Sequence, residues 1–124
     1  MSQKGNTQFA MMFTATPADV AEGEKLLASH AAWMEKTHHL DGDLQLLNYN
    51  VAKSPEFSNP LDPSSAPTGN TIYTLYEVYK NPEGLGDHWK QAQESWTDFP
   101  AMLAWAAKTN VKVLHGAPIE HSLW

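Results

Sequence analysis

Residues 72–79 alternate in the manner of a half-buried strand and lead directly into a helix start at Asn81-Pro82-Glu83. On such a strand Glu77 and Tyr79 share one face, because successive side chains point to opposite faces of a sheet. His88 follows about two turns into a helix that must fold back over the sheet. A carboxylate, a phenol and an imidazole are therefore expected to converge on one partly apolar pocket, which indicates a small-molecule site.

The length and the charge of the chain exclude several classes of protein. With 124 residues, of which 42% are apolar, the chain is sized for one domain over 1–124 with a single core. Its 8 Lys and Arg residues are scattered and outnumbered by 14 Asp and Glu residues, so no nucleic-acid partner is expected. Cysteine is absent, which excludes disulfides, thiolate catalysis and Cys-ligated metals.

The N-terminal segment and the hydropathy of the chain predict a soluble protein. Residues 1–8 are polar and lack the apolar core of a signal peptide, and no apolar run approaches membrane-spanning length. We therefore expect a cytoplasmic protein with no membrane partner. Five Trp, four Tyr and four Phe exceed the needs of a small core, so some of these rings are expected to line a cavity or a subunit interface.

Periodicity and capping residues divide the chain into strands and helices. Thr16 and Pro17 suit the N-cap and the first position of a helix, and Thr97-Asp98 can cap a further short helix. The predicted elements are a strand at 9–15, a helix at 17–36, strands at 44–51 and 71–80, a helix at 82–96, a helix that ends at 108, a strand at 110–115 and a tail at 116–124.

The stretch 52–70 is predicted to be a long loop. It contains four Pro and many Ser, Asn and Asp residues and has no periodicity, so it is either a lid or a mobile excursion. In the strand before it, Leu46, Asn48 and Asn50 are predicted to share one face. Because a buried amide needs a partner, these two Asn residues either touch solvent near a strand end or hold a ligand.

The order of the elements predicts an α+β fold of the ferredoxin-like type. A βαββαβ chain, here with an extra short helix before the last strand, forms a four-stranded antiparallel sheet with its helices on one face. The other face would leave an apolar surface larger than monomers normally tolerate. We therefore expect a homodimer in which two sheets pack face to face as a dimeric α/β barrel.

The segment from 75 to 88, which reads Leu-Tyr-Glu-Val-Tyr-Lys-Asn-Pro-Glu-Gly-Leu-Gly-Asp-His, resembles the antibiotic-biosynthesis-monooxygenase-like family of dimeric α/β barrels. Its members typically show an acidic strand residue, an aromatic residue two places later and a helical His. The family includes small quinol monooxygenases, haem-degrading monooxygenases and stress-responsive barrel proteins, so the resemblance implies one of these functions. Tyr79 stands where the family often has Trp, and the strand at 9–15 lacks the Asn of the haem-degrading members, so haem degradation is less expected.

The resemblance implies a cofactor-independent oxygenation of a quinol or phenolic substrate, with three catalytic residues. His88 would take a proton from a substrate hydroxyl, and Tyr79 and Glu77 would orient that hydroxyl. The structural alternatives are that His88 is a hydrogen-bonded core histidine and that Glu77 and Tyr79 form a structural hydrogen bond. Residues predicted to contact a small aromatic or apolar ligand are Phe13, His30, Asn48, Tyr73, Trp89 and Trp96.

No metal or other cofactor is predicted from the motifs. His38 and His39 are adjacent, so they point apart, and the preference of cationic His for a helix C-terminal end accounts for them. Gly84 and Gly86 form no dinucleotide-binding fingerprint. The alternative to an enzyme is a non-catalytic ligand-binding or stress-associated barrel.

Overall fold

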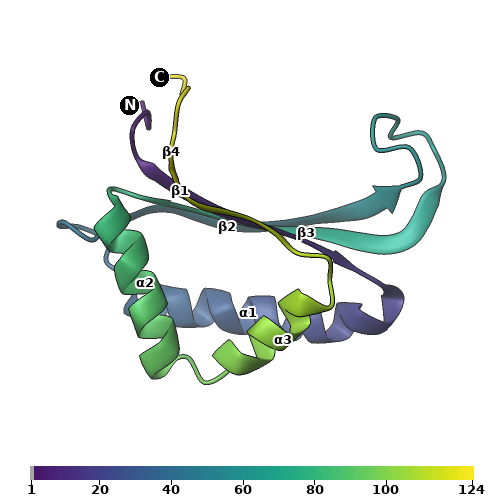
Figure 1. The fold of residues 1–124 in the computed structure, drawn as a ribbon, viewed down its shortest axis with the longest axis horizontal. Helices are drawn as coiled ribbons and strands as arrows, with labels where there is room; N and C mark the ends of the chain where they lie inside the picture. Colours follow the sequence, from purple (N-terminus) through teal and green to yellow (C-terminus); the bar gives the residue numbers. More distant parts are fainter. Residues whose placement is uncertain (1) are drawn as a thin grey trace.

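The computed structural model describes residues 2–124 and shows an α+β fold with an open, four-stranded antiparallel sheet in the strand order β2-β3-β1-β4. All helices lie on one face of the sheet (Figure 1). This arrangement is compatible with the predicted ferredoxin-like fold. The elements in chain order are β1 (Thr7–Ala15), a 3-10 turn (Pro17–Asp19), α1 (Val20–Thr37), β2 (Leu46–Phe57), β3 (Pro67–Tyr79), α2 (Pro82–Ser95), α3 (Phe99–Ala107) and β4 (Lys112–Pro118).

Asn81 forms the expected N-cap hydrogen bond at the start of its helix, whereas Thr16 does not. Asn81 caps α2, because its side-chain oxygen accepts a 3.0 Å hydrogen bond from the Gly84 amide. Thr16 forms no such bond to a backbone amide, and its hydroxyl instead donates to the Asp19 carboxylate at 3.3 Å. The first turn is correspondingly a 3-10 turn, and the α-helix begins only at Val20.

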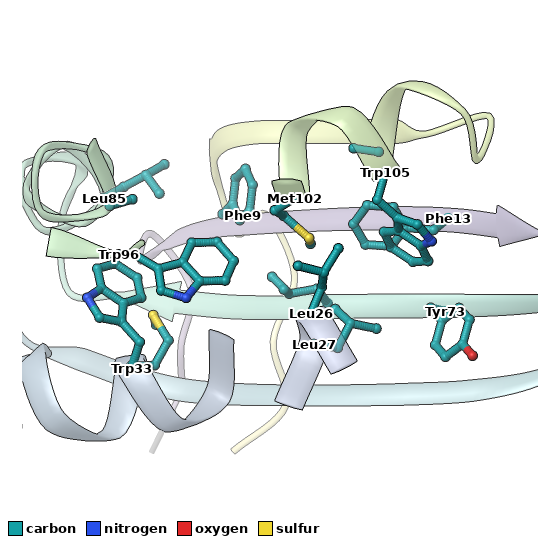
Figure 2. Close-up of a cluster of buried hydrophobic side chains, with 14 of the residues drawn as sticks. Phe9, Phe13, Leu26, Leu27, Trp33, Tyr73, Leu85, Trp96, Met102 and Trp105 are labelled. Atoms are coloured by element: carbon teal, nitrogen blue, oxygen red, sulfur yellow. The ribbon is translucent and has the colours of Figure 1, made fainter. Parts of the chain in front are cut away.

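The core lies between the sheet and the helices. Phe9 and Phe13 of β1 and Leu75 of β3 are each at most 1% exposed, and they project from the sheet toward the helices. Figure 2 shows this layer from Trp33 and Trp96 at one end to Phe13 and Trp105 at the other. The alternation seen in the sequence therefore places one face of each central strand in the core.

The predicted loop at 52–70 is mostly sheet. Residues 52–57 continue β2 and residues 67–70 begin β3, so that only 58–66 form the connection. The proline pattern is compatible with strands here because β2 is an edge strand and Pro67 is the first residue of β3. Pro55 pairs with Thr71 next to an irregularity in the register, a place where a strand tolerates proline. The tip of the hairpin curls away from the helix-covered side of the sheet (Figure 1).

A β-bulge in β2 corrects the predicted face of Leu46. The register shifts between Leu46 and Asn48, so that Leu46 pairs with Tyr79 while Asn48 pairs with Val78. Leu46 consequently packs against the core, whereas Asn48 is exposed on the face without helices. The side chain of Asn50 donates a 2.9 Å hydrogen bond to Asn48, which satisfies that amide at the surface.

The C-terminal tail is tied to the N-terminal segment. β4 includes residues 116–118 of the predicted tail, and Ile119 exchanges two backbone hydrogen bonds of 2.9 Å with Gly5 and Asn6.

Among residues 2–124, none of the helices combines the length and the apolar character that crossing a bilayer requires.

Candidate functional site

Glu77 is the centre of a buried polar cluster on the helix-covered face of β3. Its side chain is 0% exposed, and its Oε1 accepts a 2.5 Å hydrogen bond from the hydroxyl of Tyr79. The two residues share this face because they are two positions apart on a strand. The other carboxylate oxygen, Oε2, has no hydrogen-bond partner. Burying a carboxylate oxygen without a hydrogen-bond partner costs folding free energy, which suggests that Glu77 has a functional role.

Two imidazoles from different helices flank this carboxylate. His30 of α1 and His88 of α2 are 4% and 2% exposed. His30 Nε2 lies 4.0 Å from Glu77 Oε2, and His88 Nδ1 lies 3.8 Å from Glu77 Oε1. Helix α2 folds back from the end of β3, as the strand-to-helix junction predicted, and thereby returns His88 to the face that carries Glu77. The predicted convergence of Glu77, Tyr79 and His88 is therefore present.

Two further residues hold the imidazoles in place. Tyr49 of β2 pairs with Glu77 in register, and its hydroxyl lies 2.7 Å from His30 Nδ1. At the end of α1, His38 Nε2 lies 2.8 Å from His88 Nδ1. Each contact orients one ring of the cluster from outside.

The hydrogen-bond network assigns the proton positions in this chain of histidines. The Thr37 hydroxyl donates to the Trp33 carbonyl at 2.8 Å, so its oxygen is left to accept from Nδ1 of His38 at 3.0 Å. Neutral His38 then offers Nε2 as an acceptor, and His88 donates to it from Nδ1. His88 is left with Nε2 as its free, unprotonated nitrogen.

Burial sets the protonation states of the cluster. Desolvation, followed by repulsion from neighbouring histidines, lowers the pKa of His88 to about 2 and that of His30 to about 3. Desolvation raises the pKa of Glu77 to about 7, although the hydrogen bond from Tyr79 acts in the opposite direction. The pKa of His38 is lowered to about 4 by desolvation, so the expected cationic His at this helix end is neutral.

An apolar cavity adjoins the two imidazoles between the sheet, α2 and α3. Its volume is about 30 Å³, which is room for about one water molecule. The rings of Phe9 and Trp89 meet edge to face at 5.3 Å, and Trp33 stacks on Trp96 at 5.6 Å beside it. His30 and His88 are the polar residues of its wall, while Glu77 lies behind them. The other lining residues are Phe9, Met11, Leu75, Trp89, Ala92, Trp96, Phe99, Met102, Leu103 and Ala106.

Of the predicted ligand contacts, His30, Trp89 and Trp96 line this cavity. Phe13 and Tyr73 are buried on the same sheet face but beside Trp105, with ring centroids 4.7 and 5.9 Å from it. Figure 2 shows this group at the opposite end of the core from Trp96.

Asn48 is also absent from the cavity, because the bulge in β2 places it on the opposite face of the sheet. The structure therefore does not bring Phe13, Tyr73 and Asn48 together with the cluster and its cavity. The sequence showed which of these residues lie in strands, but not their position along the sheet or their side of it.

Tyr49 and His38 belong to the cluster but were not predicted as site residues. The register of β2 against β3 would have identified Tyr49, because it stands directly opposite Glu77. His38 had no comparable signal, since it follows the last residue of α1, where the chain has already left the helix. Its contact with His88 depends on how α1 and α2 pack.

The cluster combines proton-transfer groups with a candidate set of metal ligands. His30, Glu77 and His88 each offer one ligand atom, and these atoms all lie within 4.8 Å of one another. Two imidazoles and a carboxylate from three different elements therefore face one point, which the motif analysis did not predict.

Comparisons with protein-family models, with curated proteins and with solved structures found no match to this chain. We therefore infer its function from the geometry of this cluster and from the residues of the β3–α2 junction.

Proposed function

We propose that this protein is a dimeric α/β barrel of the antibiotic-biosynthesis-monooxygenase type, which oxygenates a small hydroxylated aromatic molecule without a bound cofactor. One observation carries the proposal. The carboxylate of Glu77 lies fully buried behind His30 and His88, and these two imidazoles form the polar wall of an aromatic-lined cavity. Few apolar cores contain three ionisable side chains at such distances without a use for them.

In this proposal His88 accepts the proton of the ligand hydroxyl at its free Nε2. A buried imidazole with so low a pKa is a weak base by itself. Ionised Glu77, 3.8 Å from Nδ1, stabilises the imidazolium that forms, and His38 fixes the tautomer from the other side. Tyr79 holds the carboxylate in place through its 2.5 Å hydrogen bond. His88 is the catalytic residue, and Glu77, Tyr79 and His38 position it.

The reaction consumes molecular oxygen as the oxidant. Deprotonation makes the aromatic ring electron-rich, and a ring carbon forms a C–O bond to oxygen, which gives a hydroperoxide. The O–O bond then breaks and the ring C–H proton is lost. One oxygen atom stays on the ring as a quinone carbonyl, and the other leaves as water. The phenol loses four electrons and oxygen gains four, so no further reductant is required.

The cavity has to open for a ligand to enter. A site for a drug-sized aromatic molecule occupies roughly 300–1,000 Å³, far more than the cavity in its present form. Leu103 of α3 lines the cavity and is also 51% exposed, so it separates the cavity from solvent. We expect the ligand to enter between α2 and α3, with α3 moving outward.

A second copy of the chain is the proposed partner. The face of the sheet opposite the helices is bare (Figure 1) and carries a shallow groove of about 460 Å³. Met12 and Leu114 on this face are 43% and 46% exposed. Two such faces packed together would form the dimeric barrel and remove these side chains from water.

The test is oxygen consumption with a panel of phenols and quinols, preceded by a thermal-shift screen for compounds that bind. Wild type should bind at least one compound and consume oxygen with it. The variant His88→Gln should lose oxygen uptake by about 100-fold or more, while the matched control His39→Gln, at an exposed histidine, should match wild type. Full activity in His88→Gln would refute the assignment of the base.

The closed cavity favours one alternative, a barrel that binds a ligand without transforming it. In that case compounds from the panel would raise the melting temperature, but no oxygen uptake would follow. Haem handling is tested separately by adding haem and recording the Soret band. An unshifted Soret band would exclude haem as the ligand.

A further inference from the structure

We propose that His30, Glu77 and His88 form a binding site for one divalent first-row transition-metal ion of the class of Zn²⁺ and Fe²⁺. This goes beyond the proposed oxygenation, which uses the same cluster in its metal-free state. Two independent observations support it, namely the geometry of the ligand atoms and an unsatisfied carboxylate oxygen.

The spacing of the ligand atoms is close to that around a bound ion. Tetrahedral coordination with bonds of about 2.1 Å separates neighbouring ligand atoms by about 3.4 Å. His30 Nε2 and His88 Nδ1 lie 4.0 and 3.8 Å from the two oxygens of Glu77, and one ligand atom of each residue lies within 4.8 Å of the others. Small inward movements of the side chains therefore suffice to form the bonds.

The free oxygen of Glu77 supplies the second observation. Oε2 is buried, it has no hydrogen-bond donor within reach, and it is the oxygen nearest His30 Nε2. Leaving a carboxylate oxygen unpartnered in a core carries a desolvation cost that nothing in the described chain offsets. A cation bound at Oε2 would offset this cost.

The residues behind the ligands are those that a metal site needs. Tyr49 lies 2.7 Å from His30 Nδ1, so it can hold the ring with Nε2 turned toward the carboxylate. His88 donates from Nδ1 to His38 when no ion is bound, and coordination through Nδ1 requires this proton to leave.

The donor set determines the class of ion. Two imidazoles with one carboxylate suit Zn²⁺ and the other borderline divalent ions, and they leave coordination positions open on the cavity side. Mg²⁺ and Ca²⁺ prefer oxygen ligands, of which this site offers a single carboxylate. When the ion occupies Nδ1 of His88, the ring proton of the neutral imidazole lies on Nε2, so metal-loaded protein should not carry out the cofactor-free deprotonation.

The experiment is a calorimetric titration of chelator-treated full-length protein with Zn²⁺, together with a Co²⁺ titration read from its visible absorption bands. No aromatic ligand is present, so the result does not depend on the proposed reaction. We expect one ion per chain, with Zn²⁺ displacing Co²⁺. Affinity should fall by about tenfold or more in Glu77→Gln and in His30→Gln.

Matched controls distinguish this site from surface histidines and carboxylates. Glu24→Gln and His39→Gln remove exposed groups of the same kind and should bind Zn²⁺ as wild type does. Wild-type affinity in Glu77→Gln with native circular dichroism, or the absence of a 1:1 site in wild type, would overturn the proposal. If Zn²⁺ binds but metal-free protein consumes no oxygen with any phenol, the metal site stands and the oxygenase assignment fails.

Discussion

His38 at the C-terminal end of α1 and His88 in the middle of α2, fifty residues apart, face each other with their ring nitrogens 2.8 Å apart. This contact links the C-terminal end of the first helix to the residue on which the proposed chemistry depends. It also determines which nitrogen of His88 is free. The orientation of His88 is therefore set by the packing of two helices, and not by α2 alone.

Replacing His38 with Ala should destabilise the fold because it leaves the buried Nδ1–H of His88 without an acceptor. The expected loss in free energy of unfolding is about 1–3 kcal/mol. His39→Ala is the matched control and should change it by no more than about 0.5 kcal/mol, since His39 is exposed and pairs only with Asp87. Urea denaturation measures both values, and equal losses in the two variants would contradict the assigned contact.

The stability of the metal-free protein should rise from acidic pH and level off near pH 7. Folding lowers the pKa of His30, His38 and His88 to about 3, 4 and 2, so at lower pH the unfolded chain binds three protons that the folded chain excludes. Folding raises the pKa of Glu77 to about 7, so the folded state holds one extra proton between pH 4.5 and 7.

The net effect between about pH 7 and pH 5 is a loss of stability as the pH falls. The excess of roughly two protons in the unfolded state corresponds to about 2.5 kcal/mol per pH unit near pH 5.5. Above pH 7 the ionisation of Glu77 and the last deprotonation of the three histidines in the unfolded chain nearly cancel, so stability should change little. Urea midpoints measured between about pH 5 and pH 8 test this, and a stability that keeps rising down to pH 5 would contradict the neutral buried imidazoles.

The bare sheet face should hold two chains together. Leu114→Glu places a carboxylate in the groove of this face and should convert a dimer, with twice the chain mass of 13.8 kDa, into monomers. Leu61→Glu is the matched control, because Leu61 is 93% exposed in the β2–β3 connection. Light scattering after gel filtration gives the mass of each variant. A monomeric wild type, or a dimer that survives Leu114→Glu, would refute this interface.

Gly23 allows α1 to pack closely on α3. A Cβ atom at Gly23 would meet the Trp105 ring at 2.2 Å, whereas one at Gly86 of α2 would meet no atom within 4 Å. Gly23→Ala should therefore lower stability by about 1–3 kcal/mol through overpacking. Gly86→Ala should raise it by about 0.5–1 kcal/mol through helix propensity. Thermal unfolding of both variants tests the contrast, and a neutral Gly23→Ala would show that the two helices lie farther apart.

The sequence predicted most of the elements and half of the site because these depend on local signals. A short apolar run located β1, alternation located β3, and the Asn81 cap located the start of α2, so Glu77, Tyr79 and His88 could be brought to one face. The sequence did not predict the hairpin that replaces the loop at 52–70. Four prolines obscured its strands, and an edge strand tolerates a proline that a central strand would exclude.

The remainder of the site depends on tertiary packing and strand register. Tyr49 contacts His30 only because β2 and β3 pair Tyr49 with Glu77, and the bulge between Leu46 and Asn48 changes which side chains follow that register. Asn48 was placed in the site because regular alternation was assumed through the bulge. A single extra residue in a strand thus moved a predicted ligand contact to the opposite face of the sheet.

The most direct test of the central claim is the rate of oxygen uptake by Glu77→Gln with the best phenol or quinol of the panel. Glutamine keeps the size of the side chain but removes the charge that stabilises a protonated His88. We predict a rate about 100-fold or more below wild type, with Glu24→Gln, a matched change at an exposed glutamate, close to wild type. A Glu77→Gln variant that folds normally and consumes oxygen at the wild-type rate would contradict the account.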